Sequence, residues 1–420
     1  MSLHLSYPLP IFPRRNGFPT KSQSSAAKSI VSCSAVKRYI AGCKRQYTSV
    51  MIVPTGVGAA IGGYAGDALP IARALASVVD CLITHPNVLN AAMLYWPMDN
   101  VLYVEGYALD RFAEGSWALK PVHQNRSLVK QVGLVLDAGM EEELRIRHLQ
   151  VADAARASLG LPVMEYVVTD TPLMVEKWID PITGQSTGRI RHPASLLRAV
   201  QTLMNGSKVD AVAVVGRFPD DDVEETDNYR QGMGVDTLAG VEAIISHLVV
   251  KEFQIPCAHA PALSPTPLCT SLSPKSAAEE LGFTFLPCVL SGLSNAPQYL
   301  SKNFDSLGKD CILANDVDSV IVPINACGGD GTLAFARSKE YKPLIIAVEE
   351  NETVLSDSPM SLGIEAVKVS NYWEAIGVVA AHKAGIDPYS LRRNRINNIN
   401  CISSTSPNGH AVSSALQQFN

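Results

Sequence analysis

The segment with the clearest potential for chemistry is a glycine loop at residues 327–332, Cys-Gly-Gly-Asp-Gly-Thr, which follows an apolar run at 319–324. Glycines let backbone N–H groups approach an anion closely, and the start of a following helix adds partial positive charge. The carboxylate of Asp330 would act in catalysis or bind a Mg²⁺ ion. A tight strand-to-helix turn without a ligand would give the same pattern. The expected phosphate contacts are Asn325, Gly328, Gly329, Gly331 and Thr332.

A second glycine loop lies near the start of the chain, between an apolar run at 50–54 and a helix expected at 69–79. The spacing Gly56-x-Gly58-x-x-x-Gly62 is one residue away from the dinucleotide-binding fingerprint, and no acidic residue ends the next expected strand. We therefore expect a general phosphate or carboxylate cradle here rather than a classical NAD site. Its expected contacts are Gly56, Gly58, Gly62 and Gly63.

Polar residues that follow the apolar runs are further candidates, because ligands of open α/β sheets bind at the carboxyl ends of the strands. His85 and Glu105 follow two such runs and are the candidates for a general acid and base. A histidine that anchors a loop is the alternative for His85, and a surface ion pair is the alternative for Arg230. The candidate substrate ligands are Asn87, Arg217, Arg230, Glu349 and Asn351.

The elements that must position these residues alternate between short β-branched runs and amphipathic segments of helical length. Continuous apolar runs such as 211–215 are typical of strands buried on both faces of a parallel sheet. The pattern predicts an α/β fold with a doubly wound, mainly parallel sheet. The expected strands are 50–54, 80–84, 101–104, 132–136, 163–169, 210–215, 255–258, 284–290, 319–324, 344–348 and 366–369, and the expected helices include 141–159, 194–204 and 237–250.

Eleven strands are many for one sheet, so two α/β subdomains are a possible arrangement. A boundary in the turn-rich stretch 180–188 would give an N-terminal half at 49–182 and a C-terminal half at 189–393, and a surface hairpin inside one domain is the alternative. Residues 394–420 are rich in Asn and Ser and have the composition of a disordered tail. The proline-rich stretch 260–275 is expected to be a long loop of the kind that binds ligands.

The charge of the chain is divided unevenly. Residues 1–50 hold eight of the 35 basic residues and no acidic one, which leaves 27 basic against 40 acidic residues, a charge of −13, in the remainder. An acidic body argues against nucleic acid or an anionic membrane as partner. The basic, serine-rich, acid-free start is typical of an organelle transit peptide, here assigned to residues 1–48 and to the chloroplast stroma. A disordered basic tail is the alternative.

The 327–332 loop, after its strand, resembles the nucleotide-binding motif of the NAD kinase, diacylglycerol kinase and phosphofructokinase superfamily. The resemblance covers about 30 residues, through the expected strand 343–348 and the polar residues 349–351. It implies that the glycines pack against nucleotide phosphates and that Asp330 serves catalysis or metal binding. As a whole, the chain resembles an uncharacterised family of cyanobacterial and plastid proteins, and that resemblance implies no activity.

The sequence thus predicts a soluble enzyme of the chloroplast stroma that binds a phosphorylated or nucleotide small molecule, with phosphoryl transfer as the first expectation. Mg²⁺ is the cofactor that this chemistry suggests. The alternatives are a non-catalytic regulatory protein that binds a metabolite, and a lyase, isomerase or transferase that acts on a carboxylate. Neither nucleic acid nor a membrane is an expected partner, and the sequence does not specify the substrate or the oligomeric state.

Overall fold

A computed structural model describes residues 45–393 and Ile399, with gaps at 65, 90–93, 95, 122–130, 221–228, 266–269, 271, 278–283, 302–309 and 340–341. Residues 1–44 of the predicted transit peptide lie outside the described residues, as does the predicted tail 394–420 apart from Ile399. The predicted bound at residue 48 is wrong, because Tyr47 and Thr48 are buried in the fold. The described residues all belong to one compact unit, which spans 33–420.

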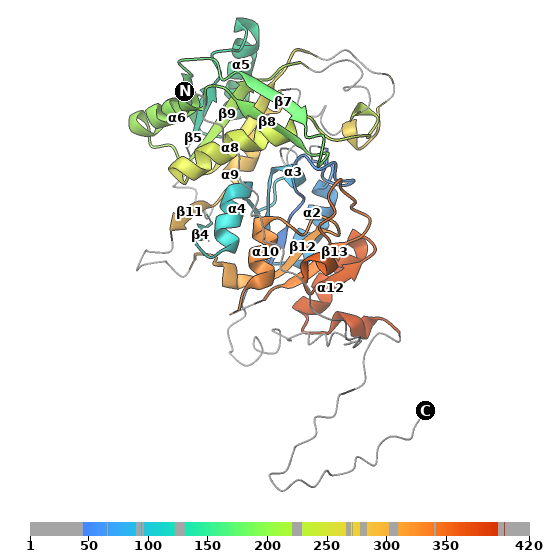
Figure 1. Cartoon of the computed structure of the whole chain (residues 1–420). Coiled ribbons are helices and arrows are strands. Elements are labelled where there is room, and N and C mark those ends of the chain that lie inside the picture. Colours follow the sequence, from blue (N-terminus) through green and yellow to red (C-terminus); the bar gives the residue numbers. More distant parts are fainter. Residues whose placement is uncertain are drawn as a thin grey trace, which may run out of the picture. The chain divides into compact units, whose positions relative to one another are not determined.

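The larger sheet has six parallel strands in the order β14-β13-β12-β1-β2-β3 (Figure 1). Nearly all of their side chains are buried, which explains the continuous apolar runs in the sequence. The strands come from both ends of the described chain. Their bounds are β1 (Thr48–Met51), β2 (Cys81–Thr84), β3 (Val101–Tyr103), β12 (Val317–Pro323), β13 (Leu344–Val348) and β14 (Val367–Val369).

The order of the strands reverses between β1 and β12. The chain runs outward from β1 through β2 to β3 on one side, and outward from β12 through β13 to β14 on the other. The two central strands are parallel neighbours, with Val50 opposite Val320. Their following loops therefore leave the same edge in different directions, and open α/β sheets bind ligands at such a point.

Helices cover both faces of this sheet, because alternate strand residues belong to two different cores. Met51 and Ile321 pack in one core with α2 (Leu69–Val78) and α12 (Tyr372–Lys383). Val50 and Val320 pack in the other core with α4 (Gly106–Ala113) and α10 (Asp330–Arg337). The predicted α/β class, with a doubly wound parallel sheet, is confirmed. Shorter elements are α3 (Pro86–Leu89), α11 (Pro359–Leu362), η2 (Ala314–Asp316) and η3 (Pro388–Leu391).

A second parallel sheet of four strands has the order β10-β9-β5-β6 and reverses between β5 and β9. Its faces are covered by α5 and α9 on one side and by α6 and α8 on the other. The bounds are β5 (Val132–Leu136), β6 (Val163–Val168), β9 (Ala211–Arg217), β10 (Cys257–Ala262), α5 (Glu142–Leu159), α6 (Pro193–Gly206), α8 (Ala239–Phe253) and α9 (Leu286–Ser294).

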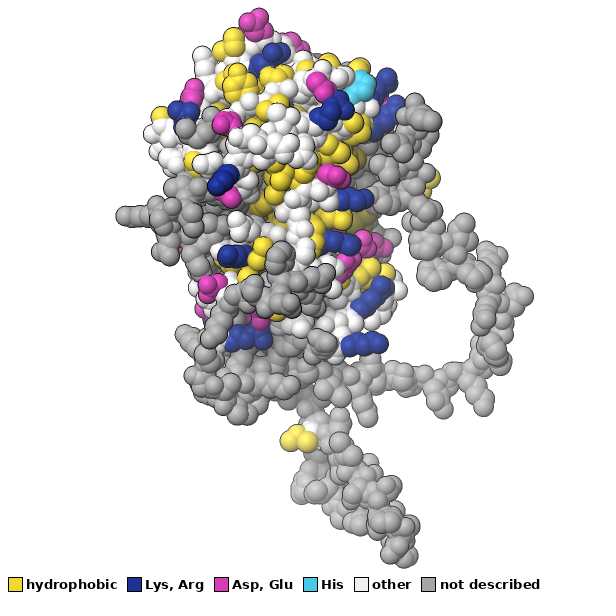
Figure 2. Space-filling model, turned by 90° about the vertical axis from the view of Figure 1, so that its left-hand side faces the viewer, with side chains coloured by type: hydrophobic (Ala, Val, Ile, Leu, Met, Phe, Trp, Pro, Cys, Tyr) yellow, Lys and Arg dark blue, Asp and Glu magenta, His cyan; other side chains and the backbone are white. Residues whose placement is uncertain are grey.

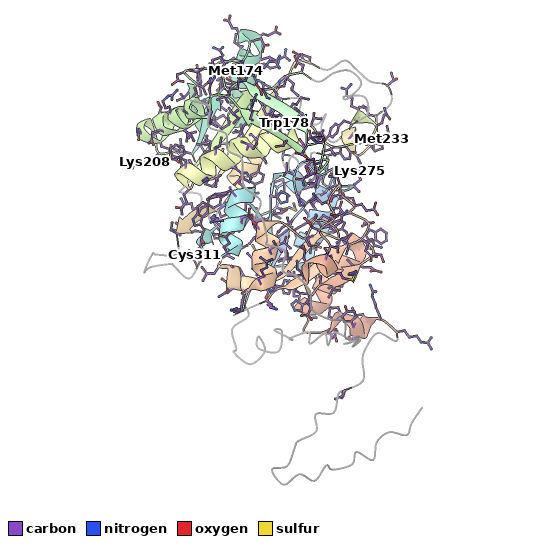
Figure 3. All side chains as sticks on the ribbon, in the orientation of Figure 1. Met174, Trp178, Lys208, Met233, Lys275 and Cys311 are labelled. Atoms are coloured by element: carbon purple, nitrogen blue, oxygen red, sulfur yellow. The ribbon has the colours of Figure 1, made fainter. Side chains whose placement is uncertain are left out.

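Two antiparallel pairs complete the described strands. The first is β4 (Trp117–Lys120) with β11 (Gln298–Ser301), and the second is the hairpin β7 (Val175–Ile179) with β8 (Ser186–Ile190). Residues 180–188, expected to be a domain boundary or a hairpin, form the turn and the start of β8 in this hairpin, beside which Met174 and Trp178 are exposed (Figure 3). The halves proposed from the sequence, 49–182 and 189–393, each contribute strands to both parallel sheets.

Two helices show how burial overrides local patterns. The expected strand 284–290 is wrong, since most of it forms the start of α9 with Pro287 in the first turn. A short apolar run does not distinguish a buried strand from a buried helix. Helix α8 has apolar residues on nearly its whole circumference because it contacts β8 and β10 and also α4 from the larger sheet. It thereby links the two parallel sheets.

Candidate functional site

The two glycine loops lie at one edge of the six-stranded sheet. The first follows β1 and the second follows β12, which are adjacent parallel strands, so both begin at the point where the strand order reverses. The same edge carries the residues that follow the other strands. His85 follows β2, Glu105 follows β3, and Glu349 follows β13. The fold therefore brings most of the residues selected from the sequence to one edge.

Within the first loop, the protein's own side chains already accept from backbone amides. The amide of Gly62 donates to Oδ1 of Asp67 at 2.6 Å, and the amide of Ile61 donates to Oδ1 of Asn351 at 2.9 Å. The side-chain amide of Asn351 in turn donates to the carbonyl of Ile61 and to the hydroxyl of Tyr372. The Asp67 carboxylate thus occupies a position that an external anion would take near the start of α2.

The glycines of this loop are required by its backbone. Gly56, Gly58 and Gly62 have φ of 70°, 59° and 85°, in the left-handed region that side chains disfavour. A Cβ at Gly63 would lie 2.2 Å from the carbonyl oxygen of Ala59. Local geometry alone therefore accounts for these four glycines, without a ligand.

In the second loop, one glycine differs from its neighbours. A Cβ at Gly328 would lie 2.3 Å from Oδ2 of Asp357, and a Cβ at Gly331 would lie 2.9 Å from Oδ1 of Asp110. A Cβ at Gly329 would meet no heavy atom within 4 Å, and its φ of −64° suits any residue. Gly329 precedes the exposed Asp330 at the start of α10, so the surrounding protein does not require a glycine there.

Carboxylates contact the glycines on either side of this open position. Oδ1 of Asp110 accepts a hydrogen bond from the amide of Gly331, and desolvation together with the charge of Asp330 raises the pKa of Asp110 to about 6. Asp357 lies against Gly328. Beneath the loop, burial raises the pKa of the Cys327 thiol to about 11, so it is a neutral thiol at physiological pH. A bare phosphate at Gly329 would be repelled by these acids unless a cation accompanied it.

Glu105 is joined to a histidine that the sequence did not single out. Oε2 of Glu105 accepts hydrogen bonds from the amides of Tyr107 and Ala108 and so caps α4. Its Oε1 lies 2.5 Å from Nδ1 of His247 on α8. Desolvation opposes protonation of His247, but the charge of Glu105 outweighs it, and the pKa of His247 is raised.

His85 has the role of a loop anchor. Its Nε2 accepts a hydrogen bond of 2.8 Å from the amide of Val53, which leads into the first glycine loop. Burial lowers the pKa of His85 to about 4, so the ring is neutral at physiological pH. The imidazole beside Glu105 therefore belongs to His247 rather than to His85.

The remaining residues selected from the sequence are mostly engaged in the framework. The side-chain amide of Asn325 exchanges hydrogen bonds with Thr353 and ties the loop after β12 to the loop after β13. Thr332 is buried in the first turn of α10, and Glu349 is exposed. Asn87 lies in α3, and the carbonyl of Arg230 accepts a hydrogen bond from the amide of Ser273.

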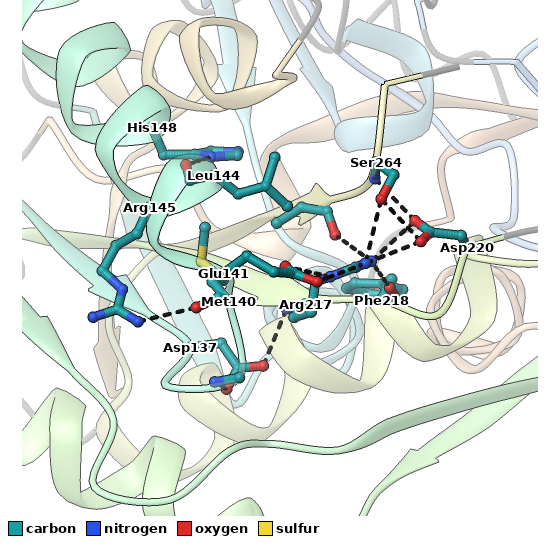
Figure 4. Close-up of polar contacts among 12 residues, drawn as sticks. Asp137, Met140, Glu141, Leu144, Arg145, His148, Arg217, Phe218, Asp220 and Ser264 are labelled. Carbon is teal, nitrogen blue, oxygen red and sulfur yellow. Dashed lines mark hydrogen bonds and ion pairs between the residues drawn. The ribbon is translucent and has the colours of Figure 1, made fainter. Parts of the chain in front are cut away.

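Arg217 belongs to a different cluster, at the strand reversal of the four-stranded sheet (Figure 4). Its guanidinium is hydrogen-bonded to the carboxylates of Asp220 and Glu141, and this pairing raises its pKa. The neighbouring Asp137 is 1% exposed and accepts three backbone amides, including that of Arg217. The described contacts of Arg217 are all within this cluster and do not include either glycine loop.

Asp110, His247 and Asp357 were missed because neither their spacing nor their neighbours form a recognisable pattern. They lie on α4, on α8 and just before α11. Among the described residues, no group of three or more His, Cys, Asp or Glu side chains is arranged to hold a metal. No helix in the same residues is long and apolar enough to cross a membrane. Basic and acidic side chains are interspersed on the face shown in Figure 2.

The structure defines an α/β protein with two doubly wound parallel sheets and a glycine-loop edge at the strand reversal of the larger one. Residues 48–392 match the family described as "Protein of unknown function (DUF3326)", and the chain belongs to this family. It is 56% identical over 349 residues to an uncharacterized lipoprotein of Synechococcus sp. (strain ATCC 27144 / PCC 6301 / SAUG 1402/1), an alignment that covers 83% of this chain and 94% of that protein. No solved structure matches the chain. The family assignment agrees with the expected likeness to cyanobacterial and plastid proteins.

Proposed function

We propose that the protein is a small-molecule enzyme that binds a phosphorylated or nucleotide ligand at the 327–332 loop and transfers a phosphoryl group. The observation that carries the proposal is the open side of Gly329, where a ligand can approach the backbone at the start of α10. This position lies at the strand reversal, where α/β sheets bind their ligands. The first glycine loop would shape the other side of the site through the contacts of Asp67 and Asn351.

The carboxylates around Gly329 argue for a divalent cation as part of the bound species. Mg²⁺ at phosphate sites usually takes one or two carboxylates and completes its shell with water and ligand oxygens. The exposed carboxylate of Asp330 fits that role, since it stands beside the open position. Bound there, Mg²⁺ would neutralise phosphate charge, which the backbone amides alone would do less well next to Asp110 and Asp357.

Thermal unfolding of the full-length chain tests the proposal. The probes are ATP, ADP and pyrophosphate, each with Mg²⁺ and with a chelator. A probe at a hundred times its dissociation constant should stabilise the protein by about 2.7 kcal/mol, and only with Mg²⁺ present. Release of phosphate from ATP is measured in parallel, because stabilisation without turnover would instead favour the non-catalytic metabolite-binding protein.

Gly329→Val is the decisive variant. Its Cβ would meet no heavy atom within 4 Å, so the unfolding temperature without ligand should fall by no more than the loss of a glycine N-cap costs, and the ligand-induced increase should disappear. Gly206→Val is the matched control, since a Cβ at Gly206 at the end of α6 also meets no atom within 4 Å. Equal stabilisation of both variants by every probe would contradict a ligand at Gly329.

We also propose that the protein acts in the chloroplast stroma after cleavage of its leader ahead of Tyr47, because Tyr47 and Thr48 are buried in the fold and Thr48 begins β1. Support comes from the eight basic and no acidic residues in 1–50 and from the family match, which begins at residue 48. Expression of the full-length chain in plant cells, followed by N-terminal sequencing of the stromal form, tests this. A product that keeps its basic leader and stays outside the plastid would contradict it.

A further inference from the structure

A carboxylate and an imidazole form a dyad near the proposed site. Glu105 is 2% exposed, and its Oε2 is engaged by two amides at the start of α4, so its Oε1 is left to face Nδ1 of His247. The His247 side chain is 42% exposed, and its Nδ1 is buried, with a contact to Glu105 that is an ion pair and not an aligned hydrogen bond. The edge of the ring that carries Nε2 faces Gly106 at the start of α4, where a Cβ would lie 3.6 Å from Nε2. A buried carboxylate at Nδ1 favours a proton there and leaves the Nε2 lone pair available.

The dyad lies next to the 327–332 loop through α4. Helix α4 contacts both α8 and α10 (Figure 1). His247 lies against Gly106 and Gly331 lies against Asp110, and these two positions are one turn apart on the same face of α4. Asp110 on α4 accepts from the amide of Gly331, and its pKa responds to the charges of both Asp330 and His247. The titratable groups that face His247 are thus Glu105 and Asp110 from α4, with the Tyr107 ring at 6.2 Å between centroids.

We propose that His247, positioned by Glu105, is the general base of the site at Gly329. This inference rests on the proposed function. Nε2 takes the proton from the attacking hydroxyl or water, and the electron pair of the broken O–H bond stays on that oxygen. The oxygen forms its new bond to phosphorus as the bond from phosphorus to the leaving oxygen breaks, and the leaving oxygen keeps that pair. The buried carboxylate of Glu105 then stabilises the imidazolium.

The dyad itself is tested by histidine titration in the full-length chain, followed by NMR of labelled imidazole groups. The signal lost in His247→Gln identifies the residue among the nine histidines. We expect its titration midpoint to lie above the ordinary value in the wild type and at lower pH in Glu105→Gln, which keeps an oxygen for the α4 amides. A midpoint that is the same in both proteins would overturn the pairing, whether or not any ligand binds.

The catalytic role is tested by phosphate release from ATP with Mg²⁺. His247→Gln should reduce the rate by about 10²–10⁴-fold and keep the ligand-induced rise in unfolding temperature. Glu105→Gln should move the rising limb of the pH–rate profile to lower pH, which a purely structural role would not do. His192→Gln, the same change at a half-buried histidine at the start of α6, should leave the rate unchanged.

These experiments show whether a failure lies in the general-base role of His247 or in the proposed function. Wild-type rates in His247→Gln would overturn the general base and leave ligand binding intact. Stabilisation of the wild type by ATP without any phosphate release would also overturn it. If ATP with Mg²⁺ neither stabilises the wild type nor releases phosphate, the proposed function fails and the catalytic role of His247 fails with it, while the titration still decides whether Glu105 holds the ring.

Discussion

Oδ1 of Asp110 accepts a hydrogen bond of 2.9 Å from the amide of Gly331, which is 221 residues further along the chain. The contact joins α4, which follows the edge strand β3, to the first turn of α10, which follows the central strand β12. One of the unpaired amides at the start of α10 is thereby satisfied by the protein itself. Asp110 consequently fixes the position of the loop, whereas Asp330 beside it is exposed and available to a ligand.

Two substitutions of Asp110 separate its hydrogen bond from its charge. Asp110→Asn keeps an oxygen for the Gly331 amide, and Asp110→Ala leaves that buried amide without a partner. We expect the alanine variant to be less stable than the asparagine variant by about 1–3 kcal/mol. Urea unfolding of both variants at pH 7 measures the difference. Equal stabilities would mean that water replaces the carboxylate oxygen.

Asp330→Asn should separate function from stability. Asp330 is exposed in the first turn of α10, where loss of an acidic charge costs at most about 1 kcal/mol. The unfolding temperature should therefore remain close to that of the wild type, while phosphate release and Mg²⁺-dependent stabilisation by ATP are lost. A variant that unfolds far more readily would show that Asp330 is part of the turn and not of the ligand site. Asp153→Asn on the exposed surface of α5 is the control.

The sequence allowed the class of fold to be predicted, because buried parallel strands leave a direct pattern. The runs at 132–136 and 344–348 are strands at the predicted bounds, since each is covered by helices on both faces. The run at 284–290 has the same apolar character and is a helix. Composition along the chain also could not show that β1 pairs with β12, because that pairing joins residues 270 or so positions apart.

The sequence predicted residues of the candidate site that follow strands, but it did not predict those that reach the site from other elements. Residues that follow parallel strands of one sheet lie at one edge, but the sequence did not show that both glycine loops and Glu105 follow strands of the same sheet. His247 lies in the middle of an apolar helix and reaches Glu105 only because α8 packs against α4. Gly328 and Gly329 likewise differ in their surroundings, because Asp357 lies against Gly328 and no heavy atom lies near a Cβ at Gly329. The fold brings Asp357 to this position, so no local sequence pattern could predict the difference.

Asp137 should be among the most important polar residues for stability. It is 1% exposed, and its two oxygens accept the amides of Gly139, Leu173 and Arg217. Asp137→Ala would leave these amides without their acceptor, and we expect a loss of about 3 kcal/mol or more in the free energy of unfolding. Urea unfolding compares it with Asp153→Ala on exposed α5, which should lose less than about 0.5 kcal/mol. A small loss in Asp137→Ala would mean that the loops around β5 and β9 rearrange.

Asp67 should make the stability of the protein depend on pH. It is 4% exposed, and burial raises its pKa from 3.8 to about 6 against the opposing effects of the Gly62 amide and Lys275. The folded state therefore holds this proton more tightly than the unfolded state, so the stabilisation is complete below pH 3.8 and is lost as the pH rises through 6.

Asp67→Asn, which keeps an oxygen for the Gly62 amide, should match the wild type in free energy of unfolding near pH 4 and exceed it at pH 8 by up to about 3 kcal/mol. Urea unfolding between pH 4 and pH 8 measures this, with Asp153→Asn as control. A variant that is less stable than the wild type at pH 8 would show that the ionised Asp67 carboxylate has a stabilising partner.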